Sequence, residues 1–351
     1  MTSNLHAPNS ATSPSSARGD APELPPARDW MPVLARYRDP SHLRSVWELV
    51  VTIVPFVALC LAAWWSLSVS YWLTLAISIP AAGFLVRFFL IQHDCGHGAF
   101  FRQRAVNDWV GRILGVFTLT PYYVWQRSHA VHHATSGNLS KRGVGDIDTL
   151  TVREYENSTP FRRFTYRLYR HPIIMFVIGP AFQFLLRNRL PQGVQEGGRR
   201  YWVSTMGTNV AIAAVAGLLI YAIGAGQFFM LALPISLLAA SIGVWMFYVQ
   251  HQFEDTVWDD GKTWEFHDAA LYGSSHYDLP FGLRWLTGYI GIHHVHHLYN
   301  RIPFYRLPQV LVDHPELKAV RRITLKESLA CVKLRLWDES QRKLVPFPKA
   351  G

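Results

Sequence analysis

Two long stretches without a charged residue constrain the fold more than any other feature of the sequence. The first runs from Leu49 to Val86 and the second from Tyr201 to Gln250. A helix that crosses a bilayer needs about 20 predominantly apolar residues, so each stretch is long enough for two crossings. Polar and glycine-containing breaks near residues 66–70 and 223–226 predict that each stretch forms a helical hairpin.

We therefore predict an all-α integral membrane protein with four transmembrane helices. The expected crossings are residues 46–65, 72–91, 201–222 and 227–249. Two further apolar segments, 109–124 and 172–186, are short or interrupted and are expected to be interfacial or re-entrant helices. The charged and aromatic residues after the fourth crossing predict a cytoplasmic helical cap.

Three regions follow from this pattern. Residues 1–45 are expected to be a disordered tail and an interfacial approach segment, because the first thirty residues are rich in Ser, Pro and Ala and have no apolar core of signal-peptide length. Residues 46–310 form the predicted membrane domain. Residues 311–351 form a predicted cytoplasmic C-terminal segment.

The charge distribution predicts the orientation in the membrane. The formal net charge is +10, and the Lys and Arg residues lie outside the two proposed hairpin turns. This is a positive-inside pattern, so we expect both termini to be cytoplasmic. We do not expect a nucleic-acid partner, because charge alone supports only non-specific association. The three cysteines are far apart and predict no disulfide framework.

Eight of the sixteen histidines fall in three clusters near the predicted inner ends of the helices. They are His93 and His97; His129, His132 and His133; and His293, His296 and His297. Residues three or four apart share one face of a helix, so each cluster can direct several imidazoles toward one point. Chance accumulation would not repeat this spacing three times. Eight imidazoles exceed what one ion can hold, so we predict two metal ions, with His251 at the same membrane depth.

Spacing alone leaves the metal open, because imidazole suits iron, zinc, copper and nickel. A structural zinc site usually has four ligands, often thiolates, and this set is too large and too poor in cysteine; Cys95 is expected to be a packing residue. Polar residues near the clusters are candidates to orient the imidazoles, although each could instead be solvated or cap a helix. These candidates are Asp94, Asn138, Asp146, Asp148, Glu254 and Asp278.

The clusters can cooperate only if they lie on one side of the membrane. This requirement indicates that residues 109–124 do not span, and it places all the histidine clusters on the cytoplasmic side. A metal transporter or sensor is the alternative from a different class. Transport sites lie on ionisable residues within the bilayer, however, and the second uncharged stretch contains no histidine before His251.

The clusters resemble the three histidine boxes of the membrane fatty acid desaturases. His93 and His97 fit an HxxxH box, and the other two clusters each fit HxxHH. The resemblance covers about residues 45–310 and includes residues 98–101, 134–139, 248–255 and 301–303. His251 resembles an additional ligand histidine of the family. Together with the eight histidines of the boxes, it brings the implied metal ligands to nine.

This resemblance implies two non-haem iron ions that use O2 and two electrons to remove two hydrogens from an acyl chain. In the spacing of its first box and in the histidine at position 293, the sequence resembles bacterial acyl-lipid desaturases of the Δ12 (ω-6) and Δ5 types. A histidine-box hydroxylase or a carotenoid ketolase would share the metal site and is the alternative within this chemistry.

The same resemblance implies the partners and a substrate channel. The substrate would be an acyl chain of a membrane lipid, and the protein is expected in a bacterial inner membrane. The electron donor would be external, because the sequence contains neither a haem-binding module nor a cysteine cluster; ferredoxin is expected, and a cytochrome b-type protein is the alternative. Candidate channel residues, which could instead pack in the core or lie in an interfacial belt, are Tyr122, Tyr123, Trp125, Trp245, Phe247 and Tyr248.

Overall fold

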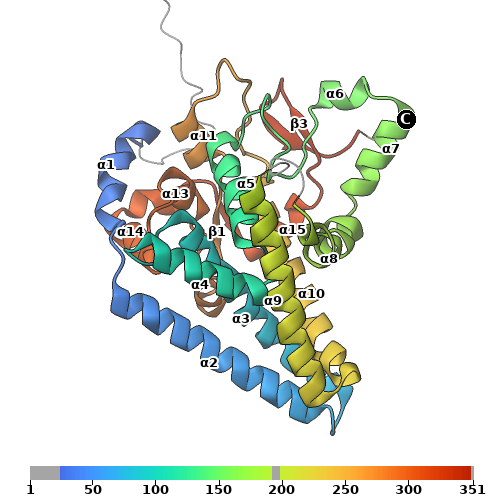
Figure 1. The fold of residues 1–351 in the computed structure, drawn as a ribbon. Coiled ribbons are helices and arrows are strands. Elements are labelled where there is room, and N and C mark those ends of the chain that lie inside the picture. Colours follow the sequence, from blue (N-terminus) through green and yellow to red (C-terminus); the bar gives the residue numbers. More distant parts are fainter. Residues whose placement is uncertain (1–23, 192–197, 349–351) are drawn as a thin grey trace, which may run out of the picture.

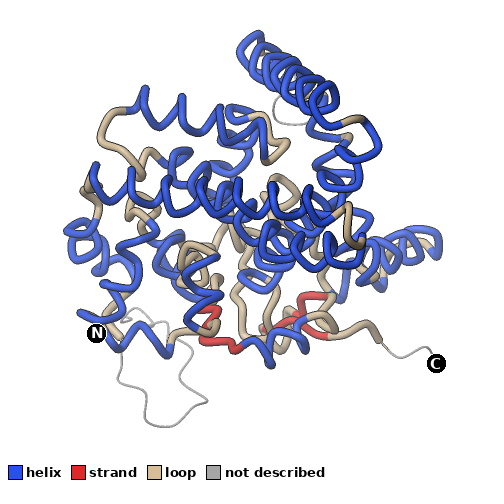
Figure 2. The backbone as a smooth tube through the Cα atoms, turned by 90° about the horizontal axis from the view of Figure 1, so that it is seen from below, coloured by secondary structure: helices blue, strands red, loops and turns tan. Residues whose placement is uncertain are grey.

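The computed structural model describes residues 24–191 and 198–348. Most of the predicted disordered tail therefore lies outside the described residues. Helices make up most of the described chain, and the few strands are confined to one side of it (Figure 2). The predicted all-α membrane fold is confirmed.

Four helices are long and apolar enough to cross a membrane: α2 (His42–Ser66), α3 (Tyr71–His97), α9 (Arg199–Ile223) and α10 (Ala225–His251). Helices of this length extend over roughly 37–40 Å, more than the hydrocarbon thickness of about 30 Å. They form the two predicted hairpins, whose turns lie together at the lower right of Figure 1. The Trp64 Nε1 group donates to Gln227 Oε1 at 2.8 Å and joins the two turns.

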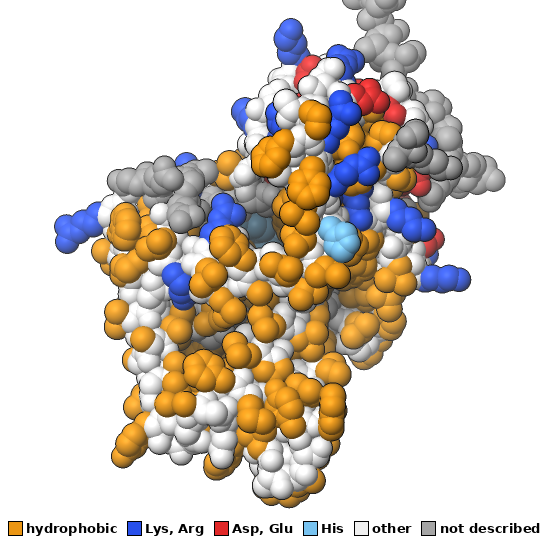
Figure 3. All heavy atoms as spheres, turned by 90° about the vertical axis from the view of Figure 1, so that its right-hand side faces the viewer, with side chains coloured by type: hydrophobic (Ala, Val, Ile, Leu, Met, Phe, Trp, Pro, Cys, Tyr) orange, Lys and Arg blue, Asp and Glu red, His pale blue; other side chains and the backbone are white. Residues whose placement is uncertain are grey.

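The surface of these helices has the character expected of a lipid-facing surface. Large apolar side chains point outward, such as Trp65 on α2 (68% exposed) and Tyr221 on α9 (92% exposed). Figure 3 shows hydrophobic side chains over the lower part of one face, while the charged side chains gather above them. Such a wide exposed apolar surface is rare on soluble monomers and marks a membrane interface here.

Helix α3 continues beyond the predicted end at residue 91 and includes both histidines of the first box. It ends at Gly98, which has a φ of 68°. Glycine adopts this left-handed conformation without the steric penalty of a Cβ atom, so it terminates the helix sharply. The first box therefore lies inside a regular helix, where the spacing of His93 and His97 is fixed.

The segment predicted at 109–124 is divided between two shorter helices. Helix α4 (Arg104–Phe117) ends before a break, and α5 (Tyr122–Thr135) follows it. Each has 14 residues and extends over only about 21 Å, less than the hydrocarbon thickness. The segment at 172–186 forms a π-helix, η3 (Ile174–Ile178), and the short helix α8 (Gly179–Leu185). Neither segment is among the candidate membrane spans.

The remaining helices are short and lie mainly around those ends of the four long helices that are remote from the hairpin turns (Figure 1). The α-helices are α1 (Trp30–Leu34), α6 (Val152–Glu156), α7 (Pro160–Tyr169), α11 (Phe266–Tyr272), α12 (Phe281–Leu286), α13 (His293–Leu298), α14 (Leu307–Asp313) and α15 (Leu325–Cys331). The other helical turns are η1 (Ala27–Asp29), η2 (Ala35–Tyr37), η4 (Arg187–Arg189), η6 (Phe304–Arg306) and η7 (Pro315–Ala319).

Two small sheets connect the parts of the cap. Strand β1 (His276–Asp278) pairs in parallel with β2 (Arg322–Thr324), with Tyr277 opposite Ile323. Strand β3 (Leu336–Asp338) pairs antiparallel with β4 (Lys343–Val345), with Trp337 opposite Leu344. The β1–β2 pairing holds the C-terminal segment against residues that follow α10, and the Leu344 backbone N–H of β4 donates to the Glu254 carbonyl at 3.0 Å.

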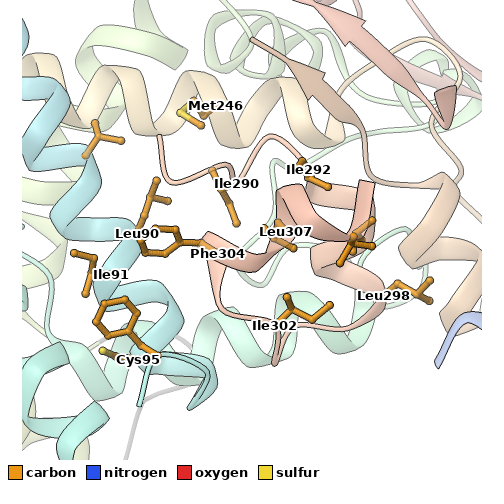
Figure 4. Packing of buried hydrophobic residues seen from close by; sticks show 14 of the residues in the cluster. Leu90, Ile91, Cys95, Met246, Ile290, Ile292, Leu298, Ile302, Phe304 and Leu307 are labelled. Atoms are coloured by element: carbon orange, nitrogen blue, oxygen red, sulfur yellow. The ribbon is translucent and has the colours of Figure 1, made fainter. Parts of the chain in front are cut away.

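A hydrophobic cluster supports the inner end of α3. Leu90, Ile91 and Cys95 of this helix pack near Ile290 and Phe304 from the cap (Figure 4). Cys95 is fully buried in this cluster, in agreement with a packing role. The approach segment also joins the cluster, because Trp30 of α1 is buried and its ring lies 5.3 Å from that of His314.

Candidate metal centre

The nine predicted ligand histidines lie in two groups. In each group, one possible ligand atom per residue lies within 4.8 Å of those of all the others. Group 1 consists of His93, His97, His129, His133 and His296. Group 2 consists of His132, His251, His293 and His297.

Helix geometry divides the second and third boxes between the two groups. On α5, His129 and His133 are four residues apart and share a face directed at group 1, whereas His132 is rotated by about 100° from His133 and belongs to group 2. On α13 the division is reversed: His293 and His297 belong to group 2, and His296 belongs to group 1. The boxes therefore do not correspond to one metal each.

Two of the membrane helices supply ligand histidines, one helix to each group. Helix α3 supplies His93 and His97, whose ring centroids are 4.7 Å apart, to group 1. Helix α10 supplies its last residue, His251, to group 2. Because α5 and α13 contribute to both groups, a displacement of either helix would affect both groups.

The distances between imidazole nitrogens fit metal ligation. In group 1, Nε2 of His129 lies 3.1 Å from Nε2 of His97 and 3.1 Å from Nε2 of His133. In group 2, Nε2 of His251 lies 3.2 Å from that of His132 and 3.0 Å from that of His293. Metal–imidazole bonds of about 2.0–2.1 Å place neighbouring ligand nitrogens of one ion roughly 3 Å apart. The donor set therefore fits a transition metal at each group.

Burial keeps the imidazoles in the form that binds metals. The pKa values of His129, His133 and His296 in group 1 are well below the ordinary value, first because of burial and then because of neighbouring imidazoles. The same causes lower the pKa values of His293 and His297. A neutral imidazole has a free lone pair for a metal ion, so ligation requires no deprotonation at neutral pH.

Two carboxylates contact imidazoles of the two groups. Asp94 Oδ1 lies 3.1 Å from Nδ1 of His93, and its Oδ2 accepts a hydrogen bond of 2.6 Å from the Phe304 backbone N–H. Asp146 Oδ1 contacts Nδ1 of His132. A carboxylate at the second ring nitrogen selects the tautomer and fixes the ring.

The other four predicted orienting residues have different partners. The Asn138 side chain accepts from the Ser140 backbone N–H at 3.0 Å, and Asp278 pairs with Arg322 at 2.7 Å. Glu254 lies 3.5 Å from Lys343 Nζ, and Asp148 is held through its backbone by Tyr169 and Arg170. These contacts order loops and strands of the cap, so their geometry does not support a role in orienting imidazoles.

An apolar cavity of about 730 Å³ reaches both histidine groups. His93 and His129 of group 1 and His293 of group 2 contribute to its wall. Most of the rest of the wall comes from α3, α5, the η3–α8 segment, α10 and the loops at residues 118–121 and 143–147, and it is formed mainly by hydrophobic residues. Its volume lies in the range of about 300–1,000 Å³ that ligand cavities occupy.

Two of the six candidate channel residues, Trp125 and Phe247, line this cavity. The other four do not belong to its wall. Tyr122 donates to the Cys95 carbonyl at 2.8 Å, and the Arg200 guanidinium lies 3.9 Å from the centre of the Tyr123 ring. Trp245 donates to Tyr277, and the Tyr248 hydroxyl donates to the Leu334 carbonyl at 2.9 Å. These four side chains pack or form hydrogen bonds within the protein.

Helical spacing explains which aromatic residues meet the cavity. Trp125 is four residues before His129, and the two rings stack with centroids 4.7 Å apart. Phe247 is four residues before His251, with centroids 5.1 Å apart. Phe89 is likewise four residues before His93 and lines the cavity. The sequence prediction did not include Phe89, although the same i, i+4 rule would have identified it.

One histidine inside the third box belongs to neither group. His294 is fully buried, and its Nε2 forms a 3.0 Å hydrogen bond with the Leu317 carbonyl. Burial lowers the pKa of His294 to about 3. This residue attaches α13 to η7 and supports the ligand histidines on either side of it.

Comparison with known proteins agrees with this architecture. Residues 70–323 match the family model described as fatty acid desaturase. This region contains all nine histidines of the two groups.

Individual relatives extend the similarity over nearly the whole chain. A fatty acid desaturase from Bacillus subtilis is 47% identical over 315 residues, which cover 90% of this chain and 89% of the relative. The sn-1 acyl-lipid omega-3 desaturase (ferredoxin) of Synechocystis is 29% identical over 62% of this chain and 61% of its own length. The sn-1 oleoyl-lipid 12-desaturase of Anabaena variabilis is 26% identical over 76% of this chain and 75% of its own length.

Proposed function

The chain belongs to the fatty acid desaturase family, and from this premise we propose that it introduces a double bond into an acyl chain of a membrane lipid at a di-iron centre. The reaction removes one hydrogen from each of two adjacent methylene carbons. O2 takes up these hydrogens together with two electrons and two protons and leaves as two water molecules. Bound iron would supply the redox chemistry that O2 requires.

The observation that carries this proposal is the contact between one apolar cavity and both histidine groups. An acyl chain has no polar group to be recognised, so it must be held by shape and by apolar contact. The cavity wall provides such contact through Phe89, Trp125 and Phe247. Because His93 and His293 line the same wall, a bound chain would pass both groups.

The protein's own residues hold and shield the reacting carbons. Gly243 of α10 lines the cavity, and a Cβ atom at this position would meet no other atom within 4 Å. Its small size leaves room for the chain at this point. The buried histidines and the aromatic wall exclude water from the site, which protects reactive species from side reactions.

The relatives support more specific proposals about substrate and electron donor. We propose an acyl-lipid substrate and a double bond of the Δ12 (ω-6) or Δ5 type, since one relative is named as an oleoyl-lipid 12-desaturase. We propose an external donor, with ferredoxin preferred because one relative carries this donor in its name. A cytochrome b5 donor, named for a plant relative, is the alternative.

The charge pattern supports a proposed orientation in a bacterial inner membrane. The histidine groups lie at the ends of α3 and α10 that are remote from the hairpin turns. Because the Lys and Arg residues lie outside these turns, we place the histidine groups, the N-terminal residues and the C-terminal segment 311–351 on the cytoplasmic side. Residues 46–310 are the proposed membrane desaturase domain.

Expression in a desaturase-free bacterial host that also produces ferredoxin tests the proposed function. Mass spectrometry of total fatty acids should reveal a new species with one more double bond than its precursor and locate that bond. His132→Ala and His296→Ala should abolish this product while the protein remains in the membrane. His267→Ala is the matched control, because His267 belongs to neither group. Full activity of either ligand variant would contradict the di-iron proposal.

A further inference from the structure

We propose that Asp146, His251 and Trp258 hold one buried water molecule and that this water fixes the orientation of His251 in group 2. The inference goes beyond the proposed function, although it rests on the proposal that group 2 binds iron. It assigns a positioning role to Trp258, which neither the histidine spacing nor the family resemblance indicates.

A cavity of about 10 Å³ lies beside group 2 and next to the cavity of about 730 Å³, with which it shares Asp146, Ile147 and Phe247. Its wall includes Asp146, Phe247, His251, Trp258 and Gly273. A cavity needs roughly 10–15 Å³ of this kind of space to accommodate one water molecule. The volume therefore fits one water and excludes a larger ligand.

Two buried polar atoms on residues of this wall, Oδ2 of Asp146 and Nε1 of Trp258, have no hydrogen-bond partner within the described protein. Nδ1 of His251 has no partner of regular hydrogen-bond geometry, although the Gly273 backbone on the same wall interacts with the His251 ring. Their residues are deeply buried, with 6% exposure of the Asp146 side chain and 6% and 4% exposure of His251 and Trp258. Buried polar groups are paired in the great majority of native structures. These three atoms on one small wall therefore point to a shared partner.

The donor and acceptor properties of these atoms match a single water. Trp258 Nε1–H can only donate, and the Asp146 carboxylate oxygen accepts. His251 directs Nε2 toward group 2, where it lies 3.2 Å from Nε2 of His132, so its Nδ1 carries the proton and donates. The water would accept from Trp258 and His251 and donate to Asp146. Buried waters typically make about three hydrogen bonds.

This arrangement lets one carboxylate orient two ligands. Asp146 Oδ1 contacts Nδ1 of His132 directly, and Oδ2 would reach Nδ1 of His251 through the water. Both rings would then direct Nε2 at the same ion. Loss of such an orienting contact typically lowers metal affinity by about 10- to 100-fold.

The C-terminal segment holds Trp258 in place. The indole packs in a small buried cluster with Trp337 of β3 and Leu344 of β4. The neighbouring Asp259 pairs with both terminal nitrogens of Arg342, at 2.9 and 3.0 Å. The β3–β4 hairpin is thus connected to group 2 through Trp258.

Trp258→Phe tests the inference because it removes the indole N–H and retains an aromatic ring. Trp337→Phe is the matched control, since Trp337 lies in the same cluster but not on the wall of the small cavity. The measurement is iron per chain in purified full-length protein, titrated with a chelator of known affinity. We expect Trp258→Phe to lose one of its two irons at a 10- to 100-fold lower chelator concentration than the wild type, and Trp337→Phe to behave like the wild type.

Asp146→Asn provides a second variant, which should weaken the same iron at least as much, because it disturbs both His132 and the water. Equal iron retention by Trp258→Phe and the wild type would overturn the inference, as would an equal loss in both tryptophan variants. An experimental structure should also show water density within hydrogen-bond distance of all three atoms, and its absence would overturn the inference. A wild type that binds two irons but forms no unsaturated product would contradict the proposed function alone.

Discussion

The two histidine groups differ in how the protein holds their ligands. Group 1 has five histidines, two of which lie on the regular membrane helix α3, and Asp94 on the same helix contacts one of them. Group 2 has four, and its orienting carboxylate, Asp146, lies in the loop between α5 and α6. Group 1 therefore has two of its five histidines and its orienting carboxylate on a membrane helix, whereas group 2 has one of its four histidines on a membrane helix and its carboxylate in a loop. We expect group 2 to be the weaker site.

Removal of one ligand from each group is expected to have the largest effect. His97→Ala leaves four histidines in group 1, whereas His251→Ala leaves only three in group 2. Both variants should lose desaturase activity to below detection. Iron analysis should find about one iron per chain in His251→Ala and more than one in His97→Ala. The same iron content in both variants would contradict the proposed difference between the groups.

A buried ion pair beneath group 1 is expected to have the next largest effect. Arg87 of α3 pairs with Glu48 of α2, and its guanidinium lies 4.3 Å from the Trp285 ring centre and 5.2 Å from that of Phe304. Arg87→Met would leave Glu48 buried with Arg44, at 2.7 Å, as its remaining cationic partner, so we expect a loss somewhat below the roughly 3–5 kcal/mol of a fully unpaired buried charge. Thermal unfolding in detergent should show a large decrease in Tm. The double variant Glu48→Gln/Arg87→Met should recover part of the loss, and no recovery would argue against the pair as the cause.

The carboxylate on α3 provides a smaller and more local test. Asp94→Ala removes the contacts with His93 and with the Phe304 backbone N–H, and we expect a 10- to 100-fold lower iron affinity. Asp94→Asn retains an acceptor oxygen and should lose less. Chelator titration measures both variants. If Asp94→Ala retains wild-type affinity, the orientation of His93 does not depend on this carboxylate.

Acid should lower the stability of the metal-free protein by protonating histidines of both groups. The pKa values of His133 in group 1 and His297 in group 2 are lowered in the folded state, so below the unfolded value of about 6.5 the unfolded chain binds more protons. Stability is therefore present above this pH and is lost as the pH falls, by up to about 1.4 kcal/mol per pH unit for each histidine. His133→Gln and His297→Gln should each flatten the dependence of Tm on pH between 7 and 5. An unchanged slope would show that the replaced histidine does not contribute.

Much of the site could be predicted from local patterns. The uncharged stretches predicted the four long helices, and the i, i+4 spacing predicted that His93 and His97 share a face of α3. Of the six aromatic channel candidates, Trp125 and Phe247 line the cavity. The patterns could not separate Asp94 and Asp146 from the other four polar candidates, because a carboxylate near a box in sequence need not face it in space.

The sequence by itself determined the helices and the angular positions of the histidines along them, because an α-helix rotates each residue by about 100° whatever surrounds it. Only the tertiary structure decided how the boxes divide between two groups, which carboxylates reach an imidazole and that Trp258 and His251 line the same water-sized cavity. Those contacts join segments far apart in the chain, such as His132 and His251. They depend on loop paths and on packing of the cap, which have no sequence period.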